Sequence, residues 1–225
     1  MGGREPVVTI DGPAGAGKGT VARRLAQRLG YRLLDTGAMY RALAWSVAAA
    51  SLPPEDTPAL RAHVGGVRIT LRGDRVLVNG RDVTDVIRTP TIAALTSRLT
   101  TLAVVREKLT PMQRAEAAPG GVVLEGRDTG TVVCPDAEVK FYLDASLETR
   151  ARRRQAEFAE RGVGMDLDAV RVEIAARDHQ DTTRALAPLA KAADAVEVDT
   201  TAMSVDEVVD RMYEIVERRR CCTRS

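Results

Sequence analysis

A glycine-rich run at residues 12–20 carries the clearest chemical signal in this sequence. It lies between a short apolar segment, Val7 to Ile10, and a segment with helical spacing, Val21 to Leu29. Glycines at a strand-to-helix turn let successive backbone N–H groups point at an anion near the positive end of the helix dipole. Lys18 would then reach the β- and γ-phosphates of a nucleotide as a point charge. The pattern predicts a phosphate loop made of Gly12, Pro13, Ala14, Gly15, Ala16, Gly17, Lys18, Gly19 and Thr20.

The same run departs from the usual phosphate-loop pattern at one position. Gly19 follows Lys18, where a Ser or Thr usually contacts Mg²⁺, and Thr20 comes one place later. Thr20 is therefore only a candidate ligand, and we expect the metal to be held partly through water or by carboxylates elsewhere. Glu125 is one such carboxylate, and the set of metal ligands stays open.

Three further segments concentrate arginine, carboxylate and hydroxyl side chains. They span residues 34–41, 125–133 and 177–189, and the second contains Gly126-Arg127-Asp128. Arginine binds phosphate through a planar fork of donors, which suits an acceptor site for a phosphorylated molecule. A phosphate loop together with such a site indicates a small phosphotransferase. A GTPase switch is excluded because the chain has no Asn-Lys-x-Asp motif to recognise guanine.

These segments, together with Ile10-Asp11-Gly12-Pro13, resemble the bacterial cytidylate kinases of the nucleoside monophosphate kinase family. The resemblance runs from Val7 to about Met212. It implies a five-stranded parallel core, a helical lid over ATP and an enlarged acceptor lobe. It also implies transfer of the γ-phosphoryl group of ATP to CMP or dCMP with Mg²⁺, giving ADP and CDP or dCDP.

The resemblance also assigns residues, position by position. Lys18, Arg127 and Arg184 would be the catalytic residues, and lid arginines would come from Arg150, Arg153, Arg154 and Arg161. Asp128 and Asp181 would hold the sugar. The late segment is poorer in arginine than in familiar relatives, which weakens its expected role as a clamp on ATP. The expected acceptor-binding residues are Thr36, Arg41, Ser97, Arg106, Arg127, Asp128, Arg177, Asp181 and Arg184.

The elements that must position these residues follow an alternating order. Short apolar runs at 7–10, 31–34, 122–124, 139–143 and 195–198 predict strands, and helical patterns fall at 21–29, 38–50 and 205–216. Strands separated by helices predict an α/β fold, with a parallel sheet and helices on both faces.

One stretch breaks this order. Residues 66–84 alternate apolar and polar side chains and contain Gly73-Asp74 and Asn79-Gly80, which are hairpin turn signals. We expect about three short antiparallel strands there, followed by a long helix over 91–117 with a break at Pro111. The basic run 218–222 is expected to be a disordered tail. The chain is expected to be one P-loop kinase domain over 1–225, with an acceptor-binding insert at 63–86 and a lid at about 146–165.

Composition narrows the function further. The net charge is only +2 and the 225 residues include seven aromatics, so neither the charge nor the stacking surface for nucleic acid is present. The three cysteines, Cys134, Cys221 and Cys222, form no disulfide or zinc pattern, which favours a reducing compartment. No signal peptide or membrane span is expected. A cytoplasmic monomer is the resulting expectation.

Three alternatives remain. One is a P-loop kinase for another nucleoside monophosphate or a metabolite, which the hairpin insert and Gly-Arg-Asp segment disfavour. Another is an ATP-binding switch that transfers no phosphate, and its ATP affinity would be insensitive to CMP. RNA binding through the 29 arginines would need a strong dependence on salt concentration.

Overall fold

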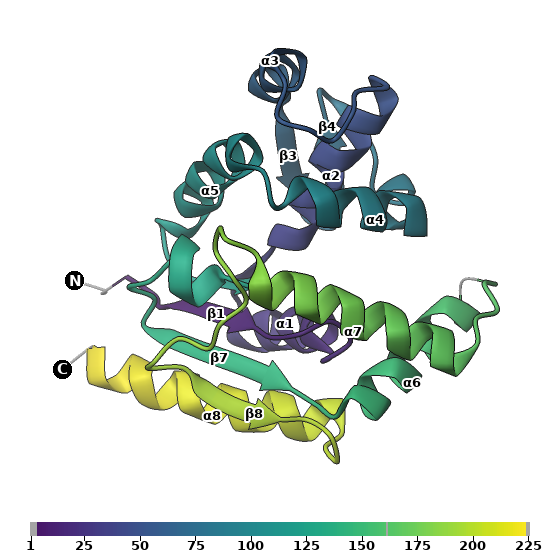
Figure 1. The fold of residues 1–225 in the computed structure, drawn as a ribbon. Coiled ribbons are helices and arrows are strands. Elements are labelled where there is room, and N and C mark those ends of the chain that lie inside the picture. Colours follow the sequence, from purple (N-terminus) through teal and green to yellow (C-terminus); the bar gives the residue numbers. More distant parts are fainter. Residues whose placement is uncertain (1–3, 161, 224–225) are drawn as a thin grey trace. The chain divides into compact units, whose positions relative to one another are not determined.

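The computed structural model describes residues 4–160 and 162–223, and five of its strands form one sheet (Figure 1). Its strand order is β2-β6-β1-β7-β8. β1 pairs in parallel with both β6 and β7, and β7 pairs in parallel with β8. The predicted α/β class and parallel sheet are confirmed. The strands are β1 (Val7–Asp11), β2 (Arg32–Asp35), β6 (Val122–Glu125), β7 (Val139–Asp144) and β8 (Val196–Asp199).

Two helices, α1 (Lys18–Leu29) and α8 (Val205–Thr223), bury their apolar stripes against this sheet. Val8 and Ile10 of β1 are fully buried in one cluster with Leu25 of α1 and Met212 of α8. Because β1 is the central strand, all five of its residues are buried. This burial fixes the strand that leads directly into the phosphate loop.

The carboxyl ends of β1 and β6 meet at one edge of the sheet, where ligands bind in open α/β folds. The glycine-rich loop follows β1 there, and the Gly-Arg-Asp segment follows β6. A short π-helical turn, η2 (Thr129–Val133), comes immediately after that segment and contacts β1. The topology therefore brings the ends of two sequence-distant segments together.

A helical hairpin formed by α6 (Leu147–Glu160) and α7 (Leu167–Thr183) lies next to the loop. Ala151 and Phe158 of α6 pack against Val170 of α7, and Ala14 of the phosphate loop belongs to the same cluster. The segment predicted as a lid, about 146–165, comprises α6 and the turn after it.

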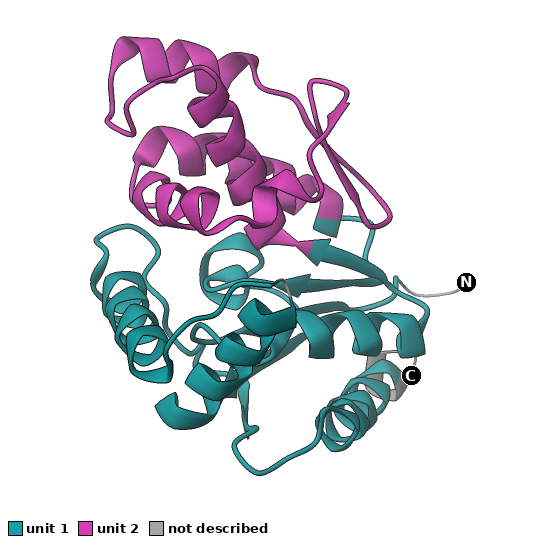
Figure 2. Ribbon diagram, turned by 90° about the vertical axis from the view of Figure 1, so that its right-hand side faces the viewer, with its two compact units in different colours: residues 1–34, 117–225 teal, residues 35–116 magenta. Residues whose placement is uncertain are grey.

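Residues 35–116 form a second compact unit, and residues 1–34 with 117–225 form the first (Figure 2). The second unit holds a three-stranded sheet in the order β3-β4-β5, with antiparallel pairing. Asn79 and Gly80 have φ of +49° and +85°, as the predicted hairpin turn requires. The predicted antiparallel insert is confirmed. The unit contains α2 (Thr36–Ala49), α3 (Pro58–Gly66), β3 (Ile69–Arg72), β4 (Arg75–Val78), β5 (Arg81–Asp82) and η1 (Val86–Arg88), followed by α4 (Pro90–Leu99) and α5 (Ala103–Ala117).

The prediction of one long helix broken at Pro111 is wrong. The helix stops at Leu99, α5 starts at Ala103, and Pro111 lies inside α5. The hydroxyls of Thr100 and Thr101 donate to the carbonyls of Ser97 and Arg98 at the break. Such bonds compete with the helical pattern, and β-branched residues already favour helices weakly. The break separates Ser97 from the arginine expected on the same helix.

The prediction of a disordered tail is also wrong as far as Thr223, because α8 continues to that residue. Arg220 donates from Nε and Nη2 to the two carboxylate oxygens of Glu5, at 2.7 and 2.9 Å, and pairs with Glu217. The helix end is therefore tied to the start of the chain. No helix in the described part of the chain is long and apolar enough to cross a membrane.

Candidate functional site

The predicted phosphate loop has the backbone shape that its glycines allow. Gly12, Gly15 and Gly17 have φ of +147°, +76° and +83°. A Cβ on Gly12 would lie 1.9 Å from the carbonyl oxygen of Leu143, so no other residue fits there. Gly17 caps α1 in the left-handed region, which leaves the first amides of the helix directed toward the loop. This is the geometry of an anion-binding turn.

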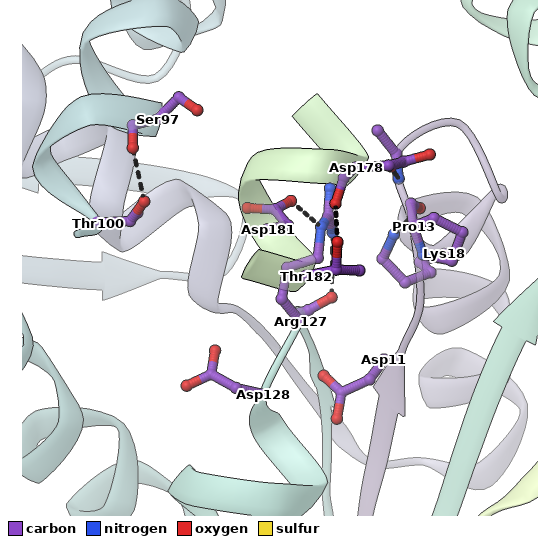
Figure 3. A network of polar contacts seen from close by, with 12 residues as sticks. Asp11, Pro13, Lys18, Ser97, Thr100, Arg127, Asp128, Asp178, Asp181 and Thr182 are labelled. Atoms are coloured by element: carbon purple, nitrogen blue, oxygen red, sulfur yellow. Dashed lines mark hydrogen bonds and ion pairs between the residues drawn. The ribbon is translucent and has the colours of Figure 1, made fainter. Parts of the chain in front are cut away.

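Lys18 is buried inside this loop, with 5% of its surface exposed. Its Nζ donates to the carbonyl oxygen of Pro13 at 2.7 Å (Figure 3). Burial, with Arg127 and Arg177 adding repulsion, lowers the pKa of the Lys18 ammonium from 10.5 to about 7, against the attraction of Glu125 and Asp11. An anion in the loop would restore the charged form, so the site is electrostatically suited to phosphate.

The phosphate loop is held from the outside by an ion pair between the two helices of the α6–α7 hairpin. The Ala14 amide donates to Oδ1 of Asp178 at 3.0 Å, and Arg150 donates from Nη1 to the Ala14 carbonyl at 3.0 Å. Arg150 also pairs with Asp178 and donates from Nε to the Ala145 carbonyl at 2.9 Å. Arg150, predicted as a lid arginine, has its guanidinium engaged by these protein acceptors.

The other predicted lid arginines differ in environment. Arg153 donates from Nη1 and Nη2 to the hydroxyl and carbonyl of Thr200, at 2.9 and 2.7 Å, and burial lowers its pKa. Arg154 pairs with Glu157 and lies over the ring of Phe158, 4.5 Å from its centre. Arg161 lies outside the described residues.

A pocket opens beside the phosphate loop, between it and the segment after β8. Its volume is about 190 Å³. Arg153 and Thr200 form polar parts of its wall, while Met203 and Val205 contribute apolar surface. A mostly apolar slot with a few polar groups, adjoining an anion-binding loop, is suited to a flat heterocyclic base attached to phosphates. Thr20, the candidate metal ligand, also lines it.

Four of the five arginines and carboxylates predicted for the acceptor in the first unit form one network. Arg127 donates from Nε to Oδ2 of Asp181 at 3.0 Å (Figure 3). The Arg184 guanidinium lies 3.6 Å from Asp128 and 3.5 Å from Asp181, and its side chain is only 4% exposed. The structure therefore brings together Arg127, Asp128, Asp181 and Arg184. Arg177 and Arg127 both lie near enough to Lys18 to lower its pKa.

Two of the four predicted acceptor residues in the second unit, Thr36 and Arg41, lie in the first two turns of α2. Asp35 caps this helix by accepting from the Ala38 amide at 2.7 Å, and it pairs with Arg41 at 2.9 Å. A Cβ on Gly37 would lie 2.9 Å from Nη1 of Arg41, so Gly37 makes room for this guanidinium. Thr36, the first residue of the helix, is buried.

Ser97 and Arg106 lie on either side of the break between α4 and α5. Arg106 is buried, donates to the Thr100 carbonyl at 3.4 Å and lies over the ring of Tyr40, 5.8 Å from its centre. The Ser97 carbonyl accepts from the Thr100 hydroxyl at 2.9 Å. The second unit thus joins Arg106 to α2, the helix that carries Thr36 and Arg41.

Sequence reasoning missed the groups that hold the loops. Asp178 follows the predicted Arg177, and Asp11 precedes the predicted Gly12, yet neither was assigned a role. Asp11 accepts from Thr129 and Gly130, directly after the Gly-Arg-Asp segment. The only indication in the sequence was that each aspartate stands next to a residue already predicted for the site. That position does not show which backbone amides the carboxylate binds.

The described residues offer no ready-made metal cage, since no three His, Cys, Asp or Glu side chains cluster suitably there. One carboxylate does approach the loop, because a Cβ on Gly19 would lie 3.0 Å from Oε2 of Glu125. Mg²⁺ in phosphate-transfer sites commonly keeps several waters and uses only one or two protein carboxylates besides substrate phosphates. Glu125 and the exposed hydroxyl of Thr20 fit that mode.

Comparison with known proteins places these features in a family. The sequence profile described as cytidylate kinase matches residues 8–218. A cytidylate kinase from Geobacter sulfurreducens is 48% identical over 226 residues, which is 99% of this chain and 97% of the relative. One from Geobacillus kaustophilus is 50% identical over 216 residues, covering 94% of this chain and 96% of the relative.

A solved structure of an uncharacterized protein from Eubacterium ventriosum has the same fold. Its TM-score is 0.52 at 12% identity, and the match covers 95% of this chain and 99% of that one. This likeness concerns the fold alone.

Proposed function

This chain belongs to the cytidylate kinase family, and we propose that the site described above transfers the γ-phosphoryl group of ATP to CMP or dCMP, giving ADP and CDP or dCDP. The observation that carries the proposal is the position of Lys18. It is buried in an anion-binding loop, and two predicted acceptor residues, Arg127 and Arg177, lie near enough to lower its pKa. This nearness supports a donor site and an acceptor site that adjoin each other within the first unit.

The donor side follows from the loop and the pocket. The amides at the start of α1 and the Lys18 ammonium bind the ATP phosphates, and the pocket walled by Met203 and Val205 takes the adenine. Mg²⁺ would be held by the phosphates, water, Thr20 and, through water, Glu125, and it neutralises phosphate charge when bound. Ala14 keeps its amide on Asp178, so the remaining loop amides are the ones that serve ATP.

The acceptor side is assigned by the family pattern and supported by the side chains present. Asp128 and Asp181 bind hydroxyl groups of the sugar, and their negative charge is balanced by Arg127 and Arg184. In the second unit, Thr36 and Ser97 supply hydroxyl groups, and Arg41 and Arg106 provide forks for the acceptor α-phosphate. Arg177 completes the positive charge near Lys18.

Phosphoryl transfer asks for positioning and charge stabilisation, with little covalent chemistry by the protein. Lys18, Arg127 and Arg184 neutralise charge that spreads over the transferred group, in a site from which water is excluded. Closure of the segment at 146–165 over ATP provides that exclusion. No protein side chain has to remove a proton from a phosphate acceptor that is already an anion.

We further propose that the enzyme is a cytoplasmic monomer organised as one P-loop kinase domain. The insert at 63–86 then belongs to the acceptor lobe. The absence of a disulfide pattern in the sequence supports the cytoplasmic location. The lack of a heptad repeat supports the monomer, and the near-neutral net charge gives no indication of a nucleic-acid partner.

The test is ADP formation from ATP and Mg²⁺ with CMP, dCMP, UMP, AMP or no acceptor, measured side by side. The expected result is fast turnover confined to CMP and dCMP. Turnover that favours a different acceptor would overturn the acceptor assignment while keeping a kinase. ATP binding without acceptor-dependent turnover would replace the kinase by a binding module.

A further inference from the structure

Asp11, at the carboxyl end of the central strand β1, is a buried carboxylate with three donors. It is only 4% exposed. Its Oδ1 accepts from the Thr129 amide at 2.9 Å and from the Thr129 hydroxyl at 2.8 Å, and its Oδ2 accepts from the Gly130 amide at 2.7 Å. All three donors belong to a segment 118 and 119 residues away in sequence.

These donors start the π-helical turn η2, which follows Arg127 and Asp128 without a gap. The Asp128 carbonyl accepts from the amides of Val132 and Val133 at 2.9 and 3.1 Å, so the turn winds directly from Asp128. Figure 3 shows Asp11 at the end of β1 and Asp128 at the end of the Gly-Arg-Asp segment that follows β6. Fixing Thr129 and Gly130 therefore fixes the backbone that carries the Asp128 side chain.

The turn η2 lies so close to β1 that the space available to side chains on both segments is restricted. A Cβ on Gly130 would lie 2.8 Å from the Thr9 hydroxyl and 3.4 Å from Oδ2 of Asp11. The turn is thus pressed against β1, and Gly12 of the phosphate loop is the next residue after Asp11. The side chain of Asp11 therefore links the strand end that leads into the phosphate loop to the segment that follows Asp128.

A carboxylate is a costly choice for such a connection. Burial raises the pKa of Asp11 against the effect of its three hydrogen bonds, and the neighbouring Asp128 raises it further. The donors that contact it are two amides and a hydroxyl, all neutral. A group of this kind contributes orientation more than stability.

We propose that Asp11 is a positioning residue that sets the placement of the Arg127–Asp128 segment against the phosphate loop, and thereby the affinity for the acceptor nucleotide. The inference rests on the proposed function, which makes that segment part of the acceptor site. Asp11 itself touches neither substrate, and it acts through Thr129 and Gly130.

The variant Asp11→Asn keeps the size of the side chain but turns one acceptor into an NH₂ group that faces a backbone donor. We expect the KM for CMP to rise about tenfold, the cost of roughly one buried polar group left unpaired. The KM for ATP should stay within about twofold. The midpoint of urea unfolding should change little, because removal of the buried charge offsets the cost of the unpaired Gly130 amide.

Two further sets of variants test the proposal even if Asp11→Asn does not fold. Thr129→Val removes one of the three donors and Thr129→Ser retains it, so only the valine variant should raise the CMP KM. Glu138→Gln is the matched control, since Glu138 accepts from the Val7 amide at 2.8 Å at the opposite end of β1. It should lower stability and leave both KM values unchanged.

The wild-type rate with CMP, measured in the same series, tests the proposed function separately from the inference. If the wild type phosphorylates CMP and Asp11→Asn or Thr129→Val leaves its KM unaltered, the positioning role is wrong. It is equally wrong if both KM values rise together in proportion to lost stability, because that is the behaviour of a purely structural contact.

Discussion

Asp178 and Asp11 each hold one loop of the site in the first unit, and they do so with different partners. Asp178 accepts from the Ala14 amide of the donor loop and is paired with Arg150, with 17% and 10% of the two side chains exposed. Among the described residues, Asp11 accepts from Thr129 and Gly130 alone, directly after the Gly-Arg-Asp segment. The donor loop is thus fixed by an ion pair, and the acceptor segment by neutral donors.

The difference determines what each carboxylate contributes. Loss of Asp178 leaves a buried guanidinium without its counter-charge, which is expensive for folding. Loss of the charge on Asp11 removes an unfavourable burial and disturbs the direction of a short turn. Its attraction for the Lys18 ammonium is also lost, but that attraction is weaker than the one from Glu125. Stability should therefore depend on Asp178, and acceptor recognition on Asp11.

The largest expected effect on stability is that of Asp178→Ala. Breaking a buried ion pair from one side costs several kcal/mol, and because Asp178 is partly exposed we expect a loss of about 3 kcal/mol. The Ala14 amide also loses its acceptor, so the KM for ATP should rise while the KM for CMP changes little. Chemical denaturation and initial rates measure the two effects.

A double variant of Arg150 and Asp178 separates the cost of an unpaired buried charge from the loss of the hydrogen bonds to Ala14. Arg150→Met with Asp178→Leu removes both charges, so most of the stability should return while the ATP KM stays raised. Asp178→Ala should lose more stability than Asp11→Asn. If it does not, the claim that folding depends on Asp178 more than on Asp11 is wrong.

A smaller effect, at most tenfold per pH unit, is expected for ATP binding above pH 7. Burial lowers the pKa of Lys18 to about 7, and bound phosphate favours the ammonium, so binding takes up a proton. ATP affinity should fall as pH rises from 7 toward 10. Stability should move the opposite way, because the unfolded chain keeps the Lys18 proton up to pH 10.5 and the folded chain does not.

Titration calorimetry at pH 8 in two buffers of different ionisation enthalpy measures this proton uptake. The wild type should take up nearly one proton per ATP, and Lys18→Met should take up none from this site. Equal heats in the two buffers for the wild type would show that Lys18 is already charged.

The parts of the fold that the sequence predicts well are local. Val7 to Ile10 and the glycines after it specify a strand and a turn within a dozen residues, and Asn79-Gly80 specifies its own hairpin. The helix break at Thr100 was missed because Pro111 is the stronger local breaker. Pro111 lies exposed inside α5, and hydroxyl-to-carbonyl bonds mark the end of α4 instead.

In the candidate site, too, residues in local motifs are predictable from the sequence and contacts between distant segments are not. Lys18 and Arg127 could be selected from motifs, because their neighbours in sequence carry the signal. Asp178 lies 164 residues from Ala14, and Arg150 lies 136 residues from it. Contacts over such separations depend on the strand order and on the α6–α7 hairpin, which no single segment encodes. The sequence alone therefore predicts Arg150 as a lid arginine and does not indicate its contacts with Ala14 and Asp178.

A two-substrate matrix of initial rates for Asp128→Ala, with ATP and CMP varied together, tests the separation of donor and acceptor groups most directly. We predict that kcat/KM for CMP falls about a hundredfold or more, as expected when a charge-assisted bond is lost and Arg184 is left without part of its counter-charge. The KM for ATP should stay within about twofold of the wild type. Equal losses for both substrates, or unaltered kinetics for CMP, would contradict the account.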